Sequence, residues 1–171
     1  MMWFRPELRV LFVCTANVCR SPLAEAMLRH RLRAMGLGRR VQVRSAGTRV
    51  GQRGRRPDPR VVKVAGEAGV SLGRIRAAPL VPDMLANSDY VLVMDRGHLS
   101  DITVLMGDAP VPESVRLLGE YVSAETAEAD IADPYFGHLE GFVEVFSQID
   151  RALDGLVPDL QQRLRGSGLA L

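Results

Sequence analysis

The sequence predicts an α/β fold, in which a central four-stranded parallel sheet carries helices on both faces within one domain over residues 1–171. Short apolar segments alternate along the chain with longer segments of helical periodicity, and this alternation is typical of a parallel sheet. The first apolar segment, residues 10–13, is continuous, as expected for a strand that is buried on both faces. A chain of 171 residues is long enough to form one domain with a substantial core.

The predicted elements alternate in order. We expect strands over residues 8–13, 41–45, 90–94 and 115–118, with a further short strand over 72–77. Helices are expected over 21–35, 59–68, 82–87, 98–106 and 142–156. Residues 1–7 are interpreted as an irregular lead-in, and residues 158–171, which begin at a proline, as an irregular tail. The spacing of apolar residues predicts buried faces on the first two helices, formed by Leu23, Ala24, Met27, Leu28, Leu32 and Met35, and by Val61, Val62, Ala65 and Ala68.

Composition and cysteine usage predict a cytoplasmic protein that does not enter a membrane. The 47% hydrophobic and 25% charged content is ordinary for a soluble chain, and no apolar run is long enough to span a bilayer. The early apolar run breaks without a cleavage region of the kind that signal peptides have. Only Cys14 and Cys19 are present, which excludes a secreted disulfide scaffold. Their closeness in one loop suggests instead a disulfide that would form under peroxide.

The net charge of +2 hides an uneven distribution. No acidic residue lies between Glu25 and Asp58, an interval that contains ten arginines. Such a field attracts anions, and it fits either a solvated surface or the binding of an acidic partner. Nucleic acid is an unfavoured partner, because no aromatic residues are interleaved with these arginines.

The most informative stretch is the loop that follows the first strand. Cys14 stands six residues before Arg20, and Ser21 and a helical pattern follow at once. A tight strand-to-helix loop can direct successive backbone N–H groups at an anion, and the helix N-terminus adds to the attraction. Arginine supplies a planar bidentate donor for phosphate, while positive surroundings stabilise a thiolate nucleophile. The pattern therefore predicts a phosphate-binding loop around a reactive thiolate, formed by Cys14, Thr15, Ala16, Asn17, Val18, Cys19, Arg20 and Ser21.

Each member of this loop has an expected task. Ser21 can donate a hydrogen bond to the sulfur of Cys14, and Asn17 can brace the loop from inside. A lone Cys14 would be interpreted as a buried structural cysteine, but its combination with Arg20 and Ser21 favours a cysteine-dependent phosphatase. A nucleotide-binding P-loop is excluded, because the chain has no Gly-Lys-Ser/Thr sequence.

Residues 14–22 resemble the signature of the low-molecular-weight protein tyrosine phosphatases, bacterial type. Residues 45–48, 58–60 and 93–95 match family segments in order, and residues 133–136 resemble the general-acid loop. The resemblance covers most of the chain. It implies that Cys14 attacks phosphorus to form a phosphocysteine, that Asp133 protonates the leaving oxygen, and that Asp133 then helps water to hydrolyse the intermediate. It also implies that Tyr135 and Phe136 form a wall of the substrate cleft.

The resemblance further implies that no metal or other cofactor is required. His30, His98 and His138 show no metal-ligand spacing and are interpreted as ordinary residues. Without the resemblance, Asp133 does not stand out from its acidic neighbours. The expected partners are a phosphorylated protein or a small phosphate ester, with inorganic phosphate as product, and the expected state is a monomer or weak dimer.

The chain departs from the family pattern at three places, and a fourth position, Val18, bears on the substrate. Ala16 replaces a glycine, which would strain the loop if the position needed positive φ. Val50 and Gly51 occupy positions where many relatives have an aromatic residue, which favours an acidic or non-aromatic substrate. Ile75 replaces a histidine that often braces the phosphate loop. Val18 resembles the branched aliphatic residue of phosphotyrosine phosphatases, where relatives that act on phosphoarginine carry threonine.

Three alternatives remain beside a phosphotyrosine phosphatase. The same fold could hydrolyse phosphoarginine or a small acidic phosphorylated metabolite. It could reduce arsenate with an external thiol, although no cysteine follows Cys19 to resolve an arsenylated intermediate. A phosphate-binding regulatory module without catalysis is the alternative from another class, and Asp133 argues against it.

Overall fold

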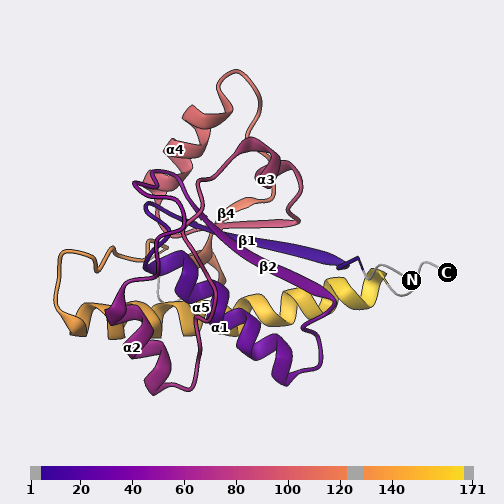
Figure 1. Ribbon diagram of the computed structural model, residues 1–171. Helices are drawn as coiled ribbons and strands as arrows, with labels where there is room; N and C mark the ends of the chain where they lie inside the picture. The colour runs from indigo at the N-terminus through magenta and orange to yellow at the C-terminus, as the bar shows by residue number, and fades with distance from the viewer. Residues whose placement is uncertain (1–4, 123–128, 168–171) are drawn as a thin grey trace.

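The computed structural model describes residues 5–122 and 129–167, and it contains one four-stranded parallel sheet (Figure 1). The strands are β1 (Leu8–Cys14), β2 (Val41–Gly47), β3 (Tyr90–Val93) and β4 (Val115–Leu117). Their order across the sheet is β2-β1-β3-β4, and all three neighbouring pairs are parallel. The predicted fold class is confirmed.

The helices cover both faces of the sheet (Figure 1). They are α1 (Arg20–Ala34), α2 (Pro59–Glu67), α3 (Pro82–Ala86), α4 (Arg96–Met106) and α5 (Leu139–Ser167), with a short 3₁₀ helix, η1 (Leu118–Tyr121). Helices α1, α2 and α5 contribute to the core on one face, while α3 and α4 pack on the other. Alternate residues of β1 enter these two cores, which explains why its sequence is apolar throughout: Val10 and Phe12 face one, and Leu11 and Val13 the other.

Helices α2 and α4 each begin at an aspartate cap. Asp58 accepts a hydrogen bond from the backbone N–H of Arg60 at 2.9 Å, and Pro59 occupies the first turn of α2. Asp95 starts α4, where its side chain accepts from the N–H of His98 while the His98 ring accepts from the N–H of Asp95. This reciprocal capping fixes the geometry of the chain just beyond the carboxyl end of β3.

Two predicted helix faces need correction. Met35, Val62 and Ala68 are exposed, whereas Val64 is buried with Val61. Met35 caps α1 rather than continuing its buried face. In α2 the buried face runs through Val61, Val64 and Ala65 at helical spacing, which turns Val62 toward solvent.

Two predictions about irregular and extended segments were wrong. Residues 72–77 form no strand, because their backbone pairs with loops: Ala77 donates to the carbonyl of Arg55 and accepts from Gly54. Residues 158–167 are helical rather than an irregular tail, because α5 continues through Pro158 to Ser167. The buried side chains of Leu160 and Leu164 continue the apolar stripe and offset the hydrogen bond that proline cannot donate.

Residues 5–7 lack regular structure, as expected, while 1–4 and 168–171 lie outside the described residues. Among the described helices, none is both long and apolar enough to cross a bilayer.

Candidate active site

The predicted phosphate-binding loop connects β1 to α1 at the carboxyl edge of the sheet. β1 ends at Cys14 and α1 begins at Arg20, so residues 15–19 form the entire connection. Ligands of open parallel sheets bind at this edge. The structure thus brings together all eight residues that the sequence singled out here.

Flanking segments hold the carbonyl groups of the loop. The N–H groups of Thr48 and Arg49 donate to the carbonyls of Cys14 and Thr15 at 2.9 and 2.8 Å, and the N–H of Asp58 donates to the carbonyl of Val18 at 2.8 Å. Within the part of the chain that the structure describes, the N–H groups of residues 15–19 have no protein acceptor. A run of free backbone donors next to a helix N-terminus is an anion-binding nest.

Gly47 allows β2 to approach this loop closely. A Cβ atom on Gly47 would lie 2.5 Å from the carbonyl oxygen of Thr15 and 3.0 Å from the backbone nitrogen of Asn17. Both contacts are with backbone, which cannot move aside without distorting the nest. Glycine is therefore required at position 47, within the segment 45–48 that resembles the family, for a steric reason.

Asn17 supplies the internal brace. It has φ of 56°, in the left-handed region that asparagine tolerates better than most residues. Its Nδ2 donates to Oγ of Ser21 at 2.8 Å, and its Oδ1 accepts from the N–H of Ala78 at 2.9 Å. Ala16 is not among the positive-φ residues, so replacing glycine there introduces no backbone strain.

The sulfur of Cys14 lies against the hydroxyl of Ser21. The Sγ–Oγ distance is 2.9 Å, and both residues are buried. Because Asn17 donates to this hydroxyl, the single O–H proton of Ser21 is free to point at the sulfur. The carbonyl of Ala46, at 3.3 Å, is the more distant acceptor for that proton.

The second cysteine differs chemically from the first. Burial, the nearby Asp58 carboxylate and Cys14 raise the pKa of Cys19 to about 12, so it remains a thiol at neutral pH. Both cysteines are free in this structure. Cys19 is therefore poorly suited to act as a thiolate nucleophile at neutral pH.

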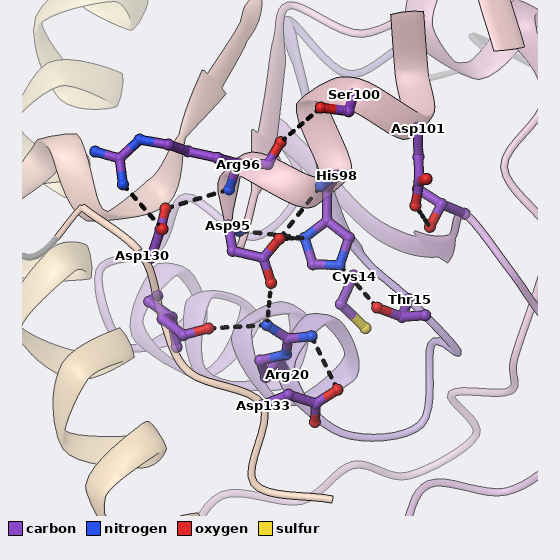
Figure 2. Close-up of polar contacts among 12 residues, drawn as sticks. Cys14, Thr15, Arg20, Asp95, Arg96, His98, Ser100, Asp101, Asp130 and Asp133 are labelled. Atoms are coloured by element: carbon purple, nitrogen blue, oxygen red, sulfur yellow. Dashed lines mark hydrogen bonds and ion pairs between the residues drawn. The ribbon is translucent and has the colours of Figure 1, made fainter. Parts of the chain in front are cut away.

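Arg20 is held in a fixed orientation, as Figure 2 shows. Its guanidinium is buried, and Nη1 donates to Oδ2 of Asp95 at 2.7 Å and to the carbonyl of Ile131 at 2.8 Å. Nη2 lies 3.2 Å from Oδ2 of Asp133. Because Asp95 and the carbonyl of Ile131 both bind Nη1, the other nitrogen, Nη2, faces Asp133 and the cleft.

The interpretation of His98 as an ordinary residue was wrong, because its ring braces the phosphate-binding loop. It is buried, and its Nε2 lies 2.9 Å from Oγ1 of Thr15 (Figure 2). The backbone N–H of Asp95 donates to its Nδ1 at 3.1 Å, which requires a lone pair on that nitrogen. Nε2 is then the N–H that donates to Thr15. This contact also supplies the loop with a histidine brace, although Ile75 occupies the expected position.

The charges in this network follow from its contacts. Burial lowers the pKa of His98 below its ordinary value, although the nearby Asp95 carboxylate opposes the shift. An ion pair between His98 Nδ1 and Asp95 Oδ1, which are 3.3 Å apart, would need a protonated ring. The backbone donor and the lowered pKa both favour the neutral ring. Burial alone would raise the pKa of Asp95, but the hydrogen bonds from the Arg20 guanidinium and from the backbone N–H of His98 hold it below its ordinary value.

The loop that carries Asp133 is attached to α2 through Arg60. The Arg60 guanidinium binds both oxygens of Asp58 and donates to the carbonyls of Tyr135 and Gly137 at 2.9 and 3.1 Å. Hydrogen bonding to Arg60 lowers the pKa of Asp58, so the pair stays ionised. Sequence reasoning did not assign this task to Arg60. In the sequence, an arginine two residues after the capping aspartate Asp58 is the feature that could have indicated this role.

The cleft above Cys14 has a volume of about 320 Å³. Tyr135 and Phe136 stand at its rim with their rings edge to face, 5.0 Å between centroids, and Phe136 is 96% exposed. Arg55 and Gly51 line it from the loop after β2. Arg49 lies there too, but Asp101 holds it in an ion pair at 2.6 Å. The loop after β2 therefore gives the cleft charge rather than a ring.

Among residues 5–122 and 129–167, no group of three or more His, Cys, Asp and Glu side chains is arranged to hold a metal ion.

Comparisons with known proteins agree with this geometry. Residues 9–166 match the family model described as "Low molecular weight phosphotyrosine protein phosphatase". A relative from Streptomyces coelicolor, named low molecular weight protein-tyrosine-phosphatase, is 36% identical over 92% of this chain and 96% of its own length. Low molecular weight protein-tyrosine phosphatase A of Mycobacterium tuberculosis is 38% identical over 94% of this chain and 96% of its own length.

A similar solved structure carries a different substrate in its name. The YwlE arginine phosphatase from Geobacillus stearothermophilus has a TM-score of 0.78 and 29% sequence identity, covering 91% of this chain and 94% of that one.

Proposed function

Because the chain belongs to the low molecular weight phosphotyrosine protein phosphatase family, we propose that it hydrolyses phosphotyrosine in proteins, with Cys14 as nucleophile and Asp133 as acid and base. Members of this family are cysteine-dependent hydrolases. One observation carries the proposal: Cys14, Arg20 and Asp133 line a single cleft whose floor is a nest of free backbone donors.

The first step forms a phosphocysteine. The substrate phosphate takes the N–H groups of the loop and Nη2 of Arg20, which Asp133 contacts in this structure. The Asp133 carboxyl then lies beside the leaving oxygen. The thiolate of Cys14 forms the S–P bond as the P–O bond breaks, and the proton of the Asp133 carboxyl goes to the departing oxygen. Arg20 and the nest stabilise the charge that spreads over the equatorial oxygens.

The second step restores the enzyme. Asp133, now a carboxylate, removes a proton from water as the water oxygen forms a bond to phosphorus. The S–P bond breaks, inorganic phosphate leaves, and the O–H of Ser21 stabilises the returning thiolate over 2.9 Å. The same carboxyl thus serves both steps by alternating its protonation state.

Two features support phosphotyrosine as the substrate. The rim residues Tyr135 and Phe136 offer ring faces and edges against which a phenyl group can pack. Val18, buried at the base of the loop, presents methyl groups rather than a hydroxyl to the cleft wall. Relatives from two bacterial genera carry protein-tyrosine phosphatase names.

Phosphoarginine is the second candidate substrate, because the similar YwlE structure is named an arginine phosphatase. A guanidinium leaving group would meet Arg55 at the cleft, a like charge that disfavours it. A cytoplasmic location and a monomeric or weakly dimeric state belong to the same proposal.

A substrate panel tests the proposal. Purified chain in excess EDTA is offered a phosphotyrosine peptide, the same peptide with phosphoarginine, para-nitrophenyl phosphate and a small sugar phosphate. We expect the phosphotyrosine peptide to have the highest kcat/KM and EDTA to leave it unchanged. A higher kcat/KM for phosphoarginine would transfer the assignment to the second candidate, and no hydrolysis of any of the four substrates would refute both.

A further inference from the structure

A second cavity, of about 820 Å³, lies at the outer edge of β2 and shares no lining residue with the cleft above Cys14. β2 is an edge strand of the sheet, and Figure 1 shows α1 and α3 on opposite sides of it. The cavity walls come from α1, α3, the first two strands and the extended segment that follows α2. Its volume falls within the range of small-molecule sites, about 300–1,000 Å³.

The polar lining is strongly basic. The lining includes one acidic residue, Glu25, and five arginines, Arg9, Arg29, Arg44, Arg74 and Arg76. The arginine-rich interval of the sequence thus divides in the fold: part of it surrounds the catalytic cleft, and part faces this cavity. Arginine guanidiniums are donors that proteins use to hold phosphate groups.

The carboxylate is already satisfied by protein partners. Glu25 is buried, accepts a hydrogen bond from Ser45, and forms an ion pair with Arg29 at 2.7 Å. Arg29 also donates to the carbonyl of Val43 at 2.8 Å, which protects the open edge of β2. Among the described residues, neither Arg44 nor Arg74 forms a salt bridge, although the charge of Arg44 lies near enough to Glu25 to favour its ionised form. Edge protection therefore accounts for Arg29 but not for Arg44 and Arg74.

The remaining lining is suited to an apolar group. Met84, which is half-buried, and Ile75, which is largely buried, line the apolar part of the cavity, and Asn87 and Ser88 add neutral hydrogen-bonding groups. A ligand complementary to this lining has a flat or apolar body joined to a group with several negative charges. We propose that this cavity binds a small organic phosphate, of the size and chemistry of a nucleoside di- or triphosphate.

The cavity is connected to the catalytic loop through Ala78. Ala78 lines the cavity, and its N–H donates to Oδ1 of Asn17. Asn17 in turn holds Ser21, whose hydroxyl contacts the sulfur of Cys14. A ligand that draws on Arg74 and Arg76 restrains the segment that carries this brace. A ligand in this cavity could therefore change kcat. That effect rests on the proposed function, but binding of the ligand does not depend on it.

Binding is measured by titration calorimetry with the non-hydrolysable analogue adenosine 5′-(β,γ-imido)triphosphate. The test variant is Arg44→Gln/Arg74→Gln, and the matched control is Arg151→Gln/Arg165→Gln, which removes two exposed guanidiniums from α5 outside the cavity. We expect one site in the wild type, a Kd at least about tenfold higher in the test variant, and a Kd within about twofold of wild type in the control. Equal weakening in both variants would show general charge attraction and overturn the proposal.

Two further arms locate and identify the ligand. Inhibition of para-nitrophenyl phosphate hydrolysis that is purely competitive, and unchanged in Arg44→Gln/Arg74→Gln, would place the analogue in the catalytic cleft and contradict the proposal. Pyrophosphate that binds as tightly as the analogue would contradict the assignment to an organic phosphate. Thermal unfolding checks that the test variant is folded, and Arg74→Gln alone replaces it if the pair is not.

Discussion

The Nε2 atom of His98 lies 2.9 Å from Oγ1 of Thr15, a contact between the first turn of α4 and the phosphate-binding loop 83 residues earlier. The same ring accepts the backbone N–H of Asp95, and Asp95 holds Arg20. The buried neutral ring of His98 therefore contacts the start of the loop at Thr15 directly and its end at Arg20 through Asp95. Its charge state should affect the stability of the whole site.

Replacing His98 with Gln should flatten the dependence of stability on pH near neutrality. Burial lowers the pKa of His98 in the folded chain, so below pH 6.5 the unfolded chain binds a proton that the folded chain does not. The free energy of unfolding of the wild type then falls as pH falls through this window, by at most about 1.4 kcal/mol per pH unit. Urea denaturation from pH 7.5 to 5 measures it. Exposed His138, changed to Gln as control, should leave the slope intact, and an unaltered slope in His98→Gln would refute the assignment.

Ser21→Ala should slow turnover by about 10- to 100-fold, because the thiolate loses a hydrogen bond to a charged group. The loss should appear in single-turnover release of para-nitrophenol and in the rate of Cys14 alkylation by iodoacetate at pH 7. Ser100, whose exposed hydroxyl bonds the carbonyl of Arg96 on α4, provides the control. Equal rates for Ser21→Ala and Ser100→Ala would mean that the 2.9 Å contact has no catalytic effect.

Asp133→Ala should affect poor leaving groups most, since a good leaving group departs without a proton. We expect a loss of about 10²–10⁴-fold in kcat/KM with phenyl phosphate and a smaller loss with para-nitrophenyl phosphate. Asp130 lies in the same connection but pairs with Arg96, so Asp130→Ala is a matched control. A loss that is uniform across leaving groups would assign Asp133 a role other than proton donation.

Gly47→Ala should damage both stability and activity. The new Cβ would lie 2.5 Å from the Thr15 carbonyl oxygen, and overpacking of this kind costs about 1–3 kcal/mol. Gly66→Ala on the exposed side of α2 meets no atom within 4 Å and should instead stabilise the chain by about 0.5–1 kcal/mol. Thermal unfolding and kcat/KM report the two effects. If both variants keep wild-type activity, the close approach of β2 does not shape the nest.

The parts of the site that the sequence predicted are local. The apolar run of β1, the spacing of Cys14 and Arg20, and the helix that follows lie within one strand–loop–helix unit, where neighbouring residues determine the geometry. Asp133 needed the family resemblance, because nothing in its own surroundings distinguishes it from Asp130. Its position beside Arg20 depends on a long connection that local patterns do not describe.

The parts that were missed depend on contacts distant in sequence. His98 meets the phosphate-binding loop because β1 pairs with β3 in parallel, which brings the loop after β1 next to the α4 cap after β3. The Asp95 to His98 spacing of a capping box was a usable signal. Helix α5 continues past Pro158, where an irregular tail is predicted, because the burial of Leu160 and Leu164 maintains the helix.

The central claim is that Cys14 carries the phosphoryl group. Wild-type chain mixed with para-nitrophenyl phosphate, quenched in acid and analysed by peptide mass spectrometry should carry one phosphoryl group on Cys14. Cys19→Ser should keep that adduct, because Cys19 remains a thiol at neutral pH. Cys14→Ser should lose hydrolysis, and Cys14→Ala should lose both adduct formation and hydrolysis. Full hydrolysis by Cys14→Ser, or a phosphoryl group on any other side chain of the wild type, would contradict the mechanism.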